Sequence, residues 1–164
     1  MAYSTTVKTR RDGSITLKDG TSPAKVALVV AYEGDGNFTY SDTVADRVVI
    51  YDRGAIVGLR KGNNSIQSGS FSIAMRQFTD AAQAGSVIDF INKTGNYSGN
   101  ISSGGNAFKF YTVDIHLVVE GTDHGDASDH EVTLSNCLCT YDFSEGEQNS
   151  FTINFECYGG ISRS

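Results

Sequence analysis

Apolar and polar residues alternate most regularly in the last third of the chain. The pattern covers residues 111–119, 137–143 and 151–157, where the apolar residues occupy odd positions. A period of two residues is typical of a strand with one face in the core and the other exposed. We therefore predict three strands, with residues 144–148 joining the last two as a hairpin. The predicted core-facing residues are Tyr111, Val113, Ile115, Leu117, Val119, Cys137, Cys139, Tyr141, Phe143, Phe151, Ile153, Phe155 and Cys157.

The apolar pattern slips by one residue within residues 131–143. Val132 and Leu134 occupy even positions, whereas the apolar residues from Cys137 onward occupy odd positions. Neighbouring side chains of a strand point to opposite faces, so the slip would turn half of this strand away from the core. One extra residue in a β-bulge restores a common face, and we predict that bulge near Ser135–Asn136.

Shorter strand patterns fill the first half of the chain. They are separated by Gly- and Asp-containing turns and lie at residues 14–19, 24–34, 37–41, 46–54 and 68–78. The run 24–34 is almost continuously apolar, which predicts a strand covered on both faces. The stretch 52–69 is interpreted as polar, with an extended surface hairpin over residues 53–64.

The apolar residues of the segment 85–95 repeat with the period of a helix and not with that of a strand. Within residues 85–95, Val87, Ile88 and Ile91 share a helical face, and Ser86 and Asp89 have the spacing of a capping box. Gly95 is suited to end this helix, and residues 96–106 follow as a polar loop. The chain is thus predicted to be mainly β, an antiparallel β-sandwich or barrel-like domain with one short flanking α-helix. With 164 residues we expect one domain over 14–160, a polar N-terminal arm at 1–13 and a C-terminal tail at 161–164.

Charge is divided unevenly along the chain. The net charge of −6 argues against electrostatic binding of nucleic acid as the main function. Residues 1–109 carry 12 Lys and Arg against 9 Asp and Glu, and residues 110–164 carry 1 against 10. Surfaces of opposite sign on one subunit would favour directed association with its neighbours. Two separately solvated surfaces remain an equal alternative.

The connection 120–131 concentrates residue types that bind metals. Its positions fail the Ca²⁺ loop pattern, because the third and fifth residues counted from Asp123 are Gly125 and Ala127. A zinc site needs histidines held by regular structure, and His124 and His130 lie among turn-forming residues. We interpret the loop as a hairpin tip that binds no metal.

No motif predicts catalysis or a bound cofactor. The sequence lacks a nucleophile elbow, and Glu145 and Glu147 flank Gly146 in a tight turn. Cys137, Cys139 and Cys157 lack zinc-ligand spacing and are predicted to be buried thiols. Without a signal peptide or a long apolar run, we expect a soluble, non-enzymatic protein made in a cytoplasm, with no membrane partner.

Taken together, the chain resembles the tail tube (major tail) proteins of long-tailed bacteriophages. The segments that carry the resemblance are 46–78, 86–96, 111–137 and 150–159, and the likeness extends over roughly 14–160. It rests on the order and length of the strands, a long loop, a helix and a hairpin. The resemblance implies a tail-tube-type β domain without catalytic residues, made in the bacterial host cytoplasm and located in the virion.

The resemblance also implies a role and partners. Such proteins assemble as hexameric rings that stack into a hollow tube around a tape-measure protein, meet tail terminator and baseplate proteins, and let double-stranded DNA pass without tight binding. In the resembling family a long loop reaches the neighbouring ring, and here we expect Arg53, Arg60 and Lys61 to meet acidic loops such as 120–131. The polar faces of the last strands would line the lumen, namely Thr112, Asp114, His116, Thr140, Asp142, Thr152, Asn154 and Glu156. The alternative function is a soluble β-sandwich that binds a ligand such as a carbohydrate.

Overall fold

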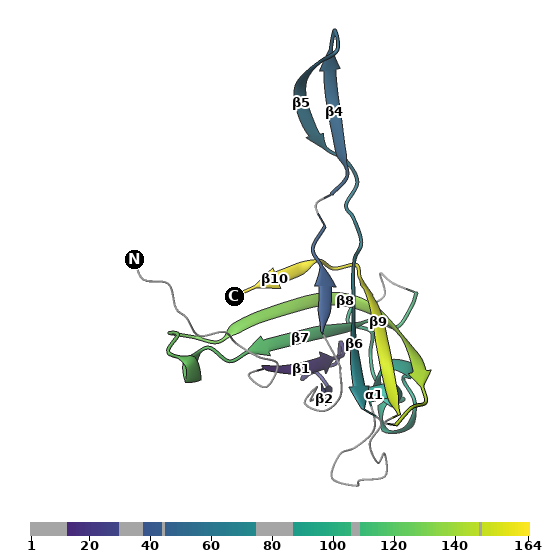
Figure 1. Ribbon diagram of the computed structural model, residues 1–164. Helices are drawn as coiled ribbons and strands as arrows, with labels where there is room; N and C mark the ends of the chain where they lie inside the picture. Colours follow the sequence, from purple (N-terminus) through teal and green to yellow (C-terminus); the bar gives the residue numbers. More distant parts are fainter. Residues whose placement is uncertain (1–12, 30–37, 44, 75–86, 106–108, 148) are drawn as a thin grey trace.

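The computed structural model describes residues 13–29, 38–43, 45–74, 87–105, 109–147 and 149–164. In this part of the chain, eight antiparallel strands form one curved sheet, and a two-stranded arm projects far from it (Figure 1). The prediction of a mainly β, sandwich- or barrel-like domain with one short helix is confirmed. The strands are β1 (Gly13–Lys18), β2 (Val26–Val29), β3 (Thr39–Ser41), β4 (Arg47–Asp52), β5 (Ala55–Lys61), β6 (Gln67–Ala74), β7 (Val113–Val119), β8 (His130–Ser144), β9 (Ser150–Cys157) and β10 (Ile161–Arg163).

The sheet has the order β2-β1-β7-β8-β9-β6-β3, and β10 also pairs with β8. Strand β8 is long enough to pair with β7 on one side and with both β9 and β10 on the other. The predicted C-terminal tail thus contributes a short strand, which continues the ladder of β9 after the turn at residues 158–160. All pairs are antiparallel, and β7 and β8 pair as a hairpin through the longer connection 120–129, as do β8 and β9 through a shorter turn.

The predicted bulge is present in β8. The register with β7 shifts at Asp114, where Ser135–Asn136 oppose a single residue. The Asn136 N–H donates a hydrogen bond to the Asp114 carboxylate at 2.8 Å, and Asn136 has a φ of +56°. Leu134 and Cys137, on either side of the bulge, are both fully buried. The extra residue therefore keeps both halves of the strand facing the core.

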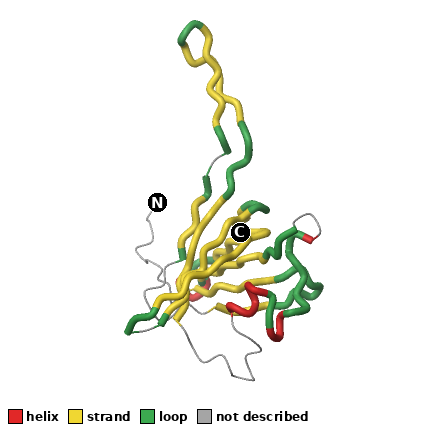
Figure 2. Tube along the Cα trace, turned by 90° about the vertical axis from the view of Figure 1, so that its right-hand side faces the viewer, coloured by secondary structure: helices red, strands yellow, loops and turns green. Residues whose placement is uncertain are grey.

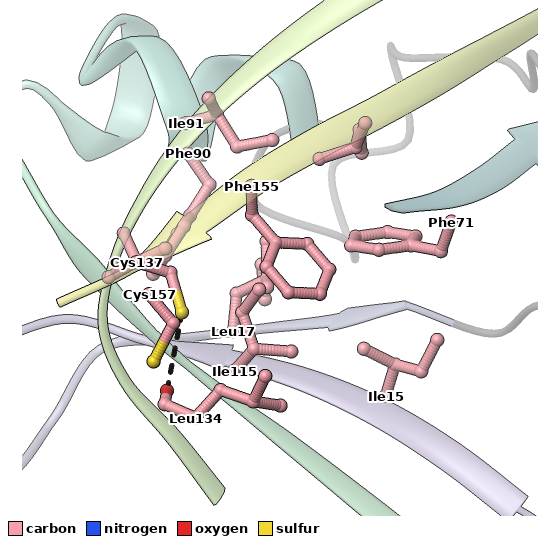
Figure 3. Packing of buried hydrophobic residues seen from close by; sticks show 13 residues of the cluster. Ile15, Leu17, Phe71, Phe90, Ile91, Ile115, Leu134, Cys137, Phe155 and Cys157 are labelled. Atoms are coloured by element: carbon pink, nitrogen blue, oxygen red, sulfur yellow. Dashed lines mark hydrogen bonds between the residues drawn. The ribbon is translucent and has the colours of Figure 1, made fainter. Parts of the chain in front are cut away.

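The core lies on the concave side of the sheet. Phe71, Phe155, Leu17, Ile115 and Leu134 meet there from five different strands (Figure 3). Phe38, which precedes β3, stacks on Phe71 and Phe155 with ring centroids 5.9 and 5.8 Å apart. The predicted core residues Tyr141 and Phe143 are 39% and 52% exposed. The apolar face of β8 therefore continues past the core toward the end of the molecule.

Helix α1 (Val87–Asn92) covers one end of the core, and two 3₁₀ turns, η2 (Gly95–Tyr97) and η4 (Thr122–His124), lie in loops. The sequence places Val87, Ile88 and Ile91 on the buried face, but the deepest side chain is Phe90, which packs edge-on against Tyr97 at 4.9 Å. The prediction that Gly95 ends the helix is wrong. Lys93 adopts a φ of +57°, and the Thr94 N–H bonds the Asp89 carbonyl at 2.9 Å, which closes the helix two residues earlier.

Strand β2 differs from its prediction. It lies at the edge of the sheet, and Val26 is 51% exposed, so this strand is not covered on both faces. Predictions for Ser86, for residues 75–78 and 30–34, and for the N-terminal residues 1–12 lie outside the described residues.

Candidate assembly surfaces

The arm is a hairpin made of β4 and β5. Arg53 and Gly54 form its tip with φ values of +48° and +86°, the two positive φ values that a tight two-residue hairpin turn requires. The register shifts between Ile50 and Tyr51, where Val57 is the extra residue. A surface hairpin is present, but it covers residues 47–61 and not the predicted 53–64, since its tip lies at Arg53 and Gly54. The interpretation of 52–69 as a polar stretch is also wrong, because β5 is rich in apolar residues.

Apolar side chains of the arm are exposed on both of its faces. A hairpin normally buries one face, since two isolated strands are at best marginally stable in water. Neither face of this arm packs against the sheet, and both views show it extending away from the body (Figures 1 and 2). The exposed residues, with the exposed fraction of each, are Val48 45%, Val49 36%, Ile50 46%, Tyr51 63%, Ile56 68%, Val57 60% and Leu59 65%.

The arm is also basic. Residues 46–62 contain four basic and two acidic side chains. Arg53 lies at the tip, whereas Arg60 and Lys61 lie near the base and on opposite faces, since they pair with Val48 and Arg47. The structure therefore distributes the three predicted contact residues along the arm and does not bring them together.

A polar surface covers the outer face of β9 and its neighbours. Thr140 pairs with Asn154 and Asp142 with Thr152 across β8 and β9, and the Asn154 side-chain amide donates to Asp142 at 2.9 Å. Glu156 is exposed further along β9. Five of the eight predicted lumen residues thus form one continuous patch.

The patch extends onto β6 through three serines that were not among the predicted lumen residues. Ser68, Ser70 and Ser72 pair with Glu156, Asn154 and Thr152 in the register of β6 and β9. Their signal is present in the sequence, because Ser70 and Ser72 alternate with Phe71 and Ile73. Only the pairing of β6 with β9 shows that they belong to the same surface.

The other predicted lumen residues lie in β7 or just before it. His116 is held between Lys18, whose Nζ lies 3.4 Å from Nδ1, and Glu131, whose carboxylate lies 3.2 Å from Nε2. Asp114 is used by the bulge of β8. These two are half-buried and sit on a different part of the sheet from the β9 patch.

The position of Thr112 contradicts its prediction as a lumen residue. It is only 1% exposed, and its hydroxyl lies 2.8 Å from Ser102 Oγ and accepts from the Gly104 N–H at 3.1 Å. The loop 100–105 folds over it, and the side chain fixes that loop. Because a residue buried within the subunit cannot face a lumen, the assignment of Thr112 to the lining is wrong.

The connection 120–131 is the hairpin tip between β7 and β8. The Asp129 carboxylate accepts hydrogen bonds from the N–H groups of Gly121 and Thr122 at 3.0 and 3.1 Å, and Asp126 lies 3.3 Å from His130. Its acidic residues thus hold the turn in shape. Within the described ranges, no three His, Cys, Asp or Glu side chains lie close enough together to hold a metal ion.

The three cysteines are free thiols. Cys137 and Cys157 face each other across β8 and β9 and are fully buried, and Cys139 is half-buried (Figure 3). Their shared hydrogen bond raises the pKa of Cys137 and lowers that of Cys157, and burial raises the pKa of Cys139 to about 12. The Cys157 Sγ also lies 3.1 and 3.2 Å from the Ser135 and Gly160 carbonyl oxygens, either of which can accept its S–H, so it helps to hold the turn before β10.

A cleft of about 280 Å³ opens where the arm joins the body. It is lined mainly by polar groups, including Asn64, Gln67 and Tyr158. Nearby, Arg163 of β10 binds Asp42 at 2.6 Å and lies over the Tyr40 ring at 5.9 Å. This ion pair ties the end of the chain to the strand from which the arm departs.

No protein-family model and no curated protein matches the chain. Its fold, however, matches chains of solved structures over nearly the whole length. One belongs to the cryo-EM structure of the sheath/tube terminator of an extracellular contractile injection system (PVC) in the extended state, with a TM-score of 0.57 and 11% identity over 99% of this chain and 98% of that one. Another belongs to the six-fold symmetrised baseplate of the anti-feeding prophage, with a TM-score of 0.53 and 7% identity over 100% and 97%. At these identities the likeness concerns the fold. In the described residues, no helix is both long and apolar enough to cross a membrane.

Proposed function

We propose that the protein is a structural subunit of a phage-tail-like particle and assembles with copies of itself into stacked rings. The observation that carries this proposal is the arm, whose seven large apolar side chains are exposed on both faces in the single subunit. Single exposed apolar residues are common on protein surfaces, but a contiguous apolar surface of this kind is typical of an association site. The full-length fold likeness to chains of a terminator and a six-fold baseplate structure supports the same class of role.

In the proposed assembly, six subunits form a ring and stacked rings enclose a hollow tube that conducts DNA during ejection. Closing a sheet around an axis removes its unpaired edges, and β2 and β3 are the edge strands available here. A tape-measure protein inside the tube and terminator and baseplate proteins at its ends would be the partners. The subunit would be made in the bacterial host cytoplasm and end up in the virion.

The polar patch of β8 and β9 is the surface we assign to the lumen. Its carboxylates, Asp142 and Glu156, repel phosphate, so DNA would pass without binding, whereas a row of Lys or Arg would hold it. In an assembled particle, Asp142, Asn154 and Glu156 should point toward the axis. Density that places them on the outside of the tube would refute this assignment.

Arg53, Arg60 and Lys61 are proposed to contact acidic surfaces of the neighbouring ring. Exposed ion pairs contribute only about 0–1 kcal/mol each, but sixfold repetition multiplies the effect. Reversing all three charges should shorten or abolish tubes while the subunit stays folded, since all three side chains are exposed. Tubes of normal length from that variant would rule out the contact.

Electron microscopy of the concentrated protein, together with sedimentation over a concentration series, tests the proposal directly. We expect rings or filaments that appear as concentration rises. A subunit that remains a monomer at every concentration would favour the alternative, a ligand-binding module. For that function the cleft at the base of the arm is the specific candidate, because Tyr158, Asn64 and Gln67 supply an aromatic face and amide groups of the kind that bind sugars.

A further inference from the structure

The turn end of strands β8 and β9 carries a second exposed surface. We call residues 141–147 the β8–β9 end. Tyr141 and Phe143 are exposed there on the apolar side of the sheet, and their rings pack on Phe151 with centroids 5.8 and 5.4 Å away. Glu145 and Glu147 in the turn beyond are also exposed. This end therefore combines aromatic rings with negative charge.

The β8–β9 end and the arm lie at opposite ends of the subunit. Strand β6 leaves the base of the arm and runs to Ala74, which pairs with Ser150 beside the β8–β9 turn. Figure 1 shows the same arrangement, with the arm at the top and the end of β8 at the bottom. A surface and its complement on opposite ends of one chain favour head-to-tail association, in which the same contact repeats from copy to copy.

The chemistry of the two ends is complementary. The arm offers apolar side chains with basic residues at its tip and base, and the β8–β9 end offers exposed rings with acidic residues beside them. The loop 120–131 is a poorer receptor. It has negative charge but no large exposed apolar side chain among its described residues, and Asp126, Asp129 and Glu131 are already bonded within the subunit. It also points sideways from the body, away from the line between arm and β8–β9 end (Figure 1).

We propose that the arm of one copy docks on the β8–β9 end of the next copy, so that apolar side chains of the arm cover Tyr141 and Phe143 while Arg53 approaches Glu145 and Glu147. This inference rests on the proposed function and names the receiving surface. It assigns the contact to the β8–β9 end in preference to the loop 120–131. Desolvated aromatic side chains beside paired charges are the arrangement that dominates the energetics of protein interfaces.

A charge exchange tests the pairing. The variant Glu145→Lys/Glu147→Lys should raise the concentration needed for assembly by about tenfold, because attraction to the arm becomes repulsion. Adding Arg53→Glu to the same chain should bring that concentration back to within about threefold of the wild type. The matched control is Glu120→Lys/Asp123→Lys, which makes the same change of charge in the loop 120–131 and should leave assembly unchanged.

Cross-linking gives an independent readout. In the variant Arg53→Lys, which keeps the charge at the tip, a carbodiimide reagent should join Lys at position 53 to Glu145 or Glu147. Mixing ordinary protein with ¹⁵N-labelled protein before the reaction identifies links between different copies by mass spectrometry. We expect mixed-isotope peptides that connect the tip to residues 141–147.

The outcomes separate this inference from the proposed function. If the wild type assembles but the reversal at Glu145 and Glu147 has no effect, or the tip links to residues 120–131, the docking assignment is wrong and the structural role stands. If charge exchange fails to restore assembly, the two ends do not meet. If the wild type neither assembles nor forms links between copies at any concentration, both proposals are refuted.

Discussion

Replacing two apolar side chains of the arm should weaken assembly without weakening the fold. Ile56 and Leu59 are 68% and 65% exposed in the free subunit, and they lie on the same face of the arm. The double variant Ile56→Thr/Leu59→Thr keeps the preference for strand, since Thr is β-branched, and removes most of the apolar surface. Exposed positions of this kind change the free energy of unfolding by about 0.5 kcal/mol or less.

The effect on association can be worked out from the exposed fractions. Full burial of an Ile or Leu side chain contributes about 1.5–3 kcal/mol, so burying the remaining two-thirds contributes about 1–2 kcal/mol for each. Thr retains part of the surface, and we therefore expect a loss of about 2 kcal/mol for the pair at each contact. A loss of that size lowers the association constant about 30-fold.

Sedimentation velocity over a concentration series measures the association, and thermal unfolding of the dilute subunit measures the fold. The control is Ile101→Thr, because Ile101 is 53% exposed but lies in a loop of the body. Unchanged assembly in the arm variant would refute the claim that the arm is an association surface. A large fall in the melting temperature would show instead that these side chains stabilise the subunit itself.

Three further predictions concern the body of the subunit. Burial would raise the pKa of Asp19, but hydrogen bonds from Thr21, Ile101 and Lys25 hold it below its ordinary value of 3.8. The ionised Asp19 carboxylate therefore stabilises the fold above pH 3.8, and this stabilisation is lost as the pH falls through the lower pKa of the folded state. Asp19→Asn should lower the free energy of unfolding by about 2 kcal/mol at pH 7. Unfolding measured over a pH series should show this difference disappearing in acid. Thr112→Val should lower the free energy of unfolding in denaturant by about 1–3 kcal/mol, because the Gly104 N–H loses its acceptor. Thr140→Val, on the exposed face, should lower it by about 0.5 kcal/mol or less. Equal losses in the two variants would contradict the burial of Thr112. His124→Asn/His130→Asn should preserve the fold and assembly, and a chelator should have no effect; a stoichiometric metal found by elemental analysis and lost in this variant would show that the loop is a metal site.

The sequence by itself determined the type and approximate position of most strands. The cause is the strict period of two, which leaves little freedom once one face must be buried: Phe151, Ile153, Phe155 and Cys157 are all buried, as their spacing requires. The same constraint located the bulge at Ser135–Asn136, because a slip of one residue has no other solution that keeps Leu134 and Cys137 in the core.

Only the tertiary structure decided which of these faces meet. Thr112 and Thr140 are equivalent in an alternating pattern, yet one is buried under the loop 100–105 and the other is exposed, since loop packing depends on residues distant in sequence. The end of α1 at Asn92 depends on the positive φ of Lys93 and on the hydrogen bond from the Thr94 N–H to the Asp89 carbonyl, which a rule based on glycine does not capture. The arm shows most clearly that a sequence pattern does not decide which strands form the core. Its apolar residues have the composition of a buried strand, and the sequence cannot reveal that the core is already filled by other strands, which leaves β4 and β5 outside the body with both faces exposed.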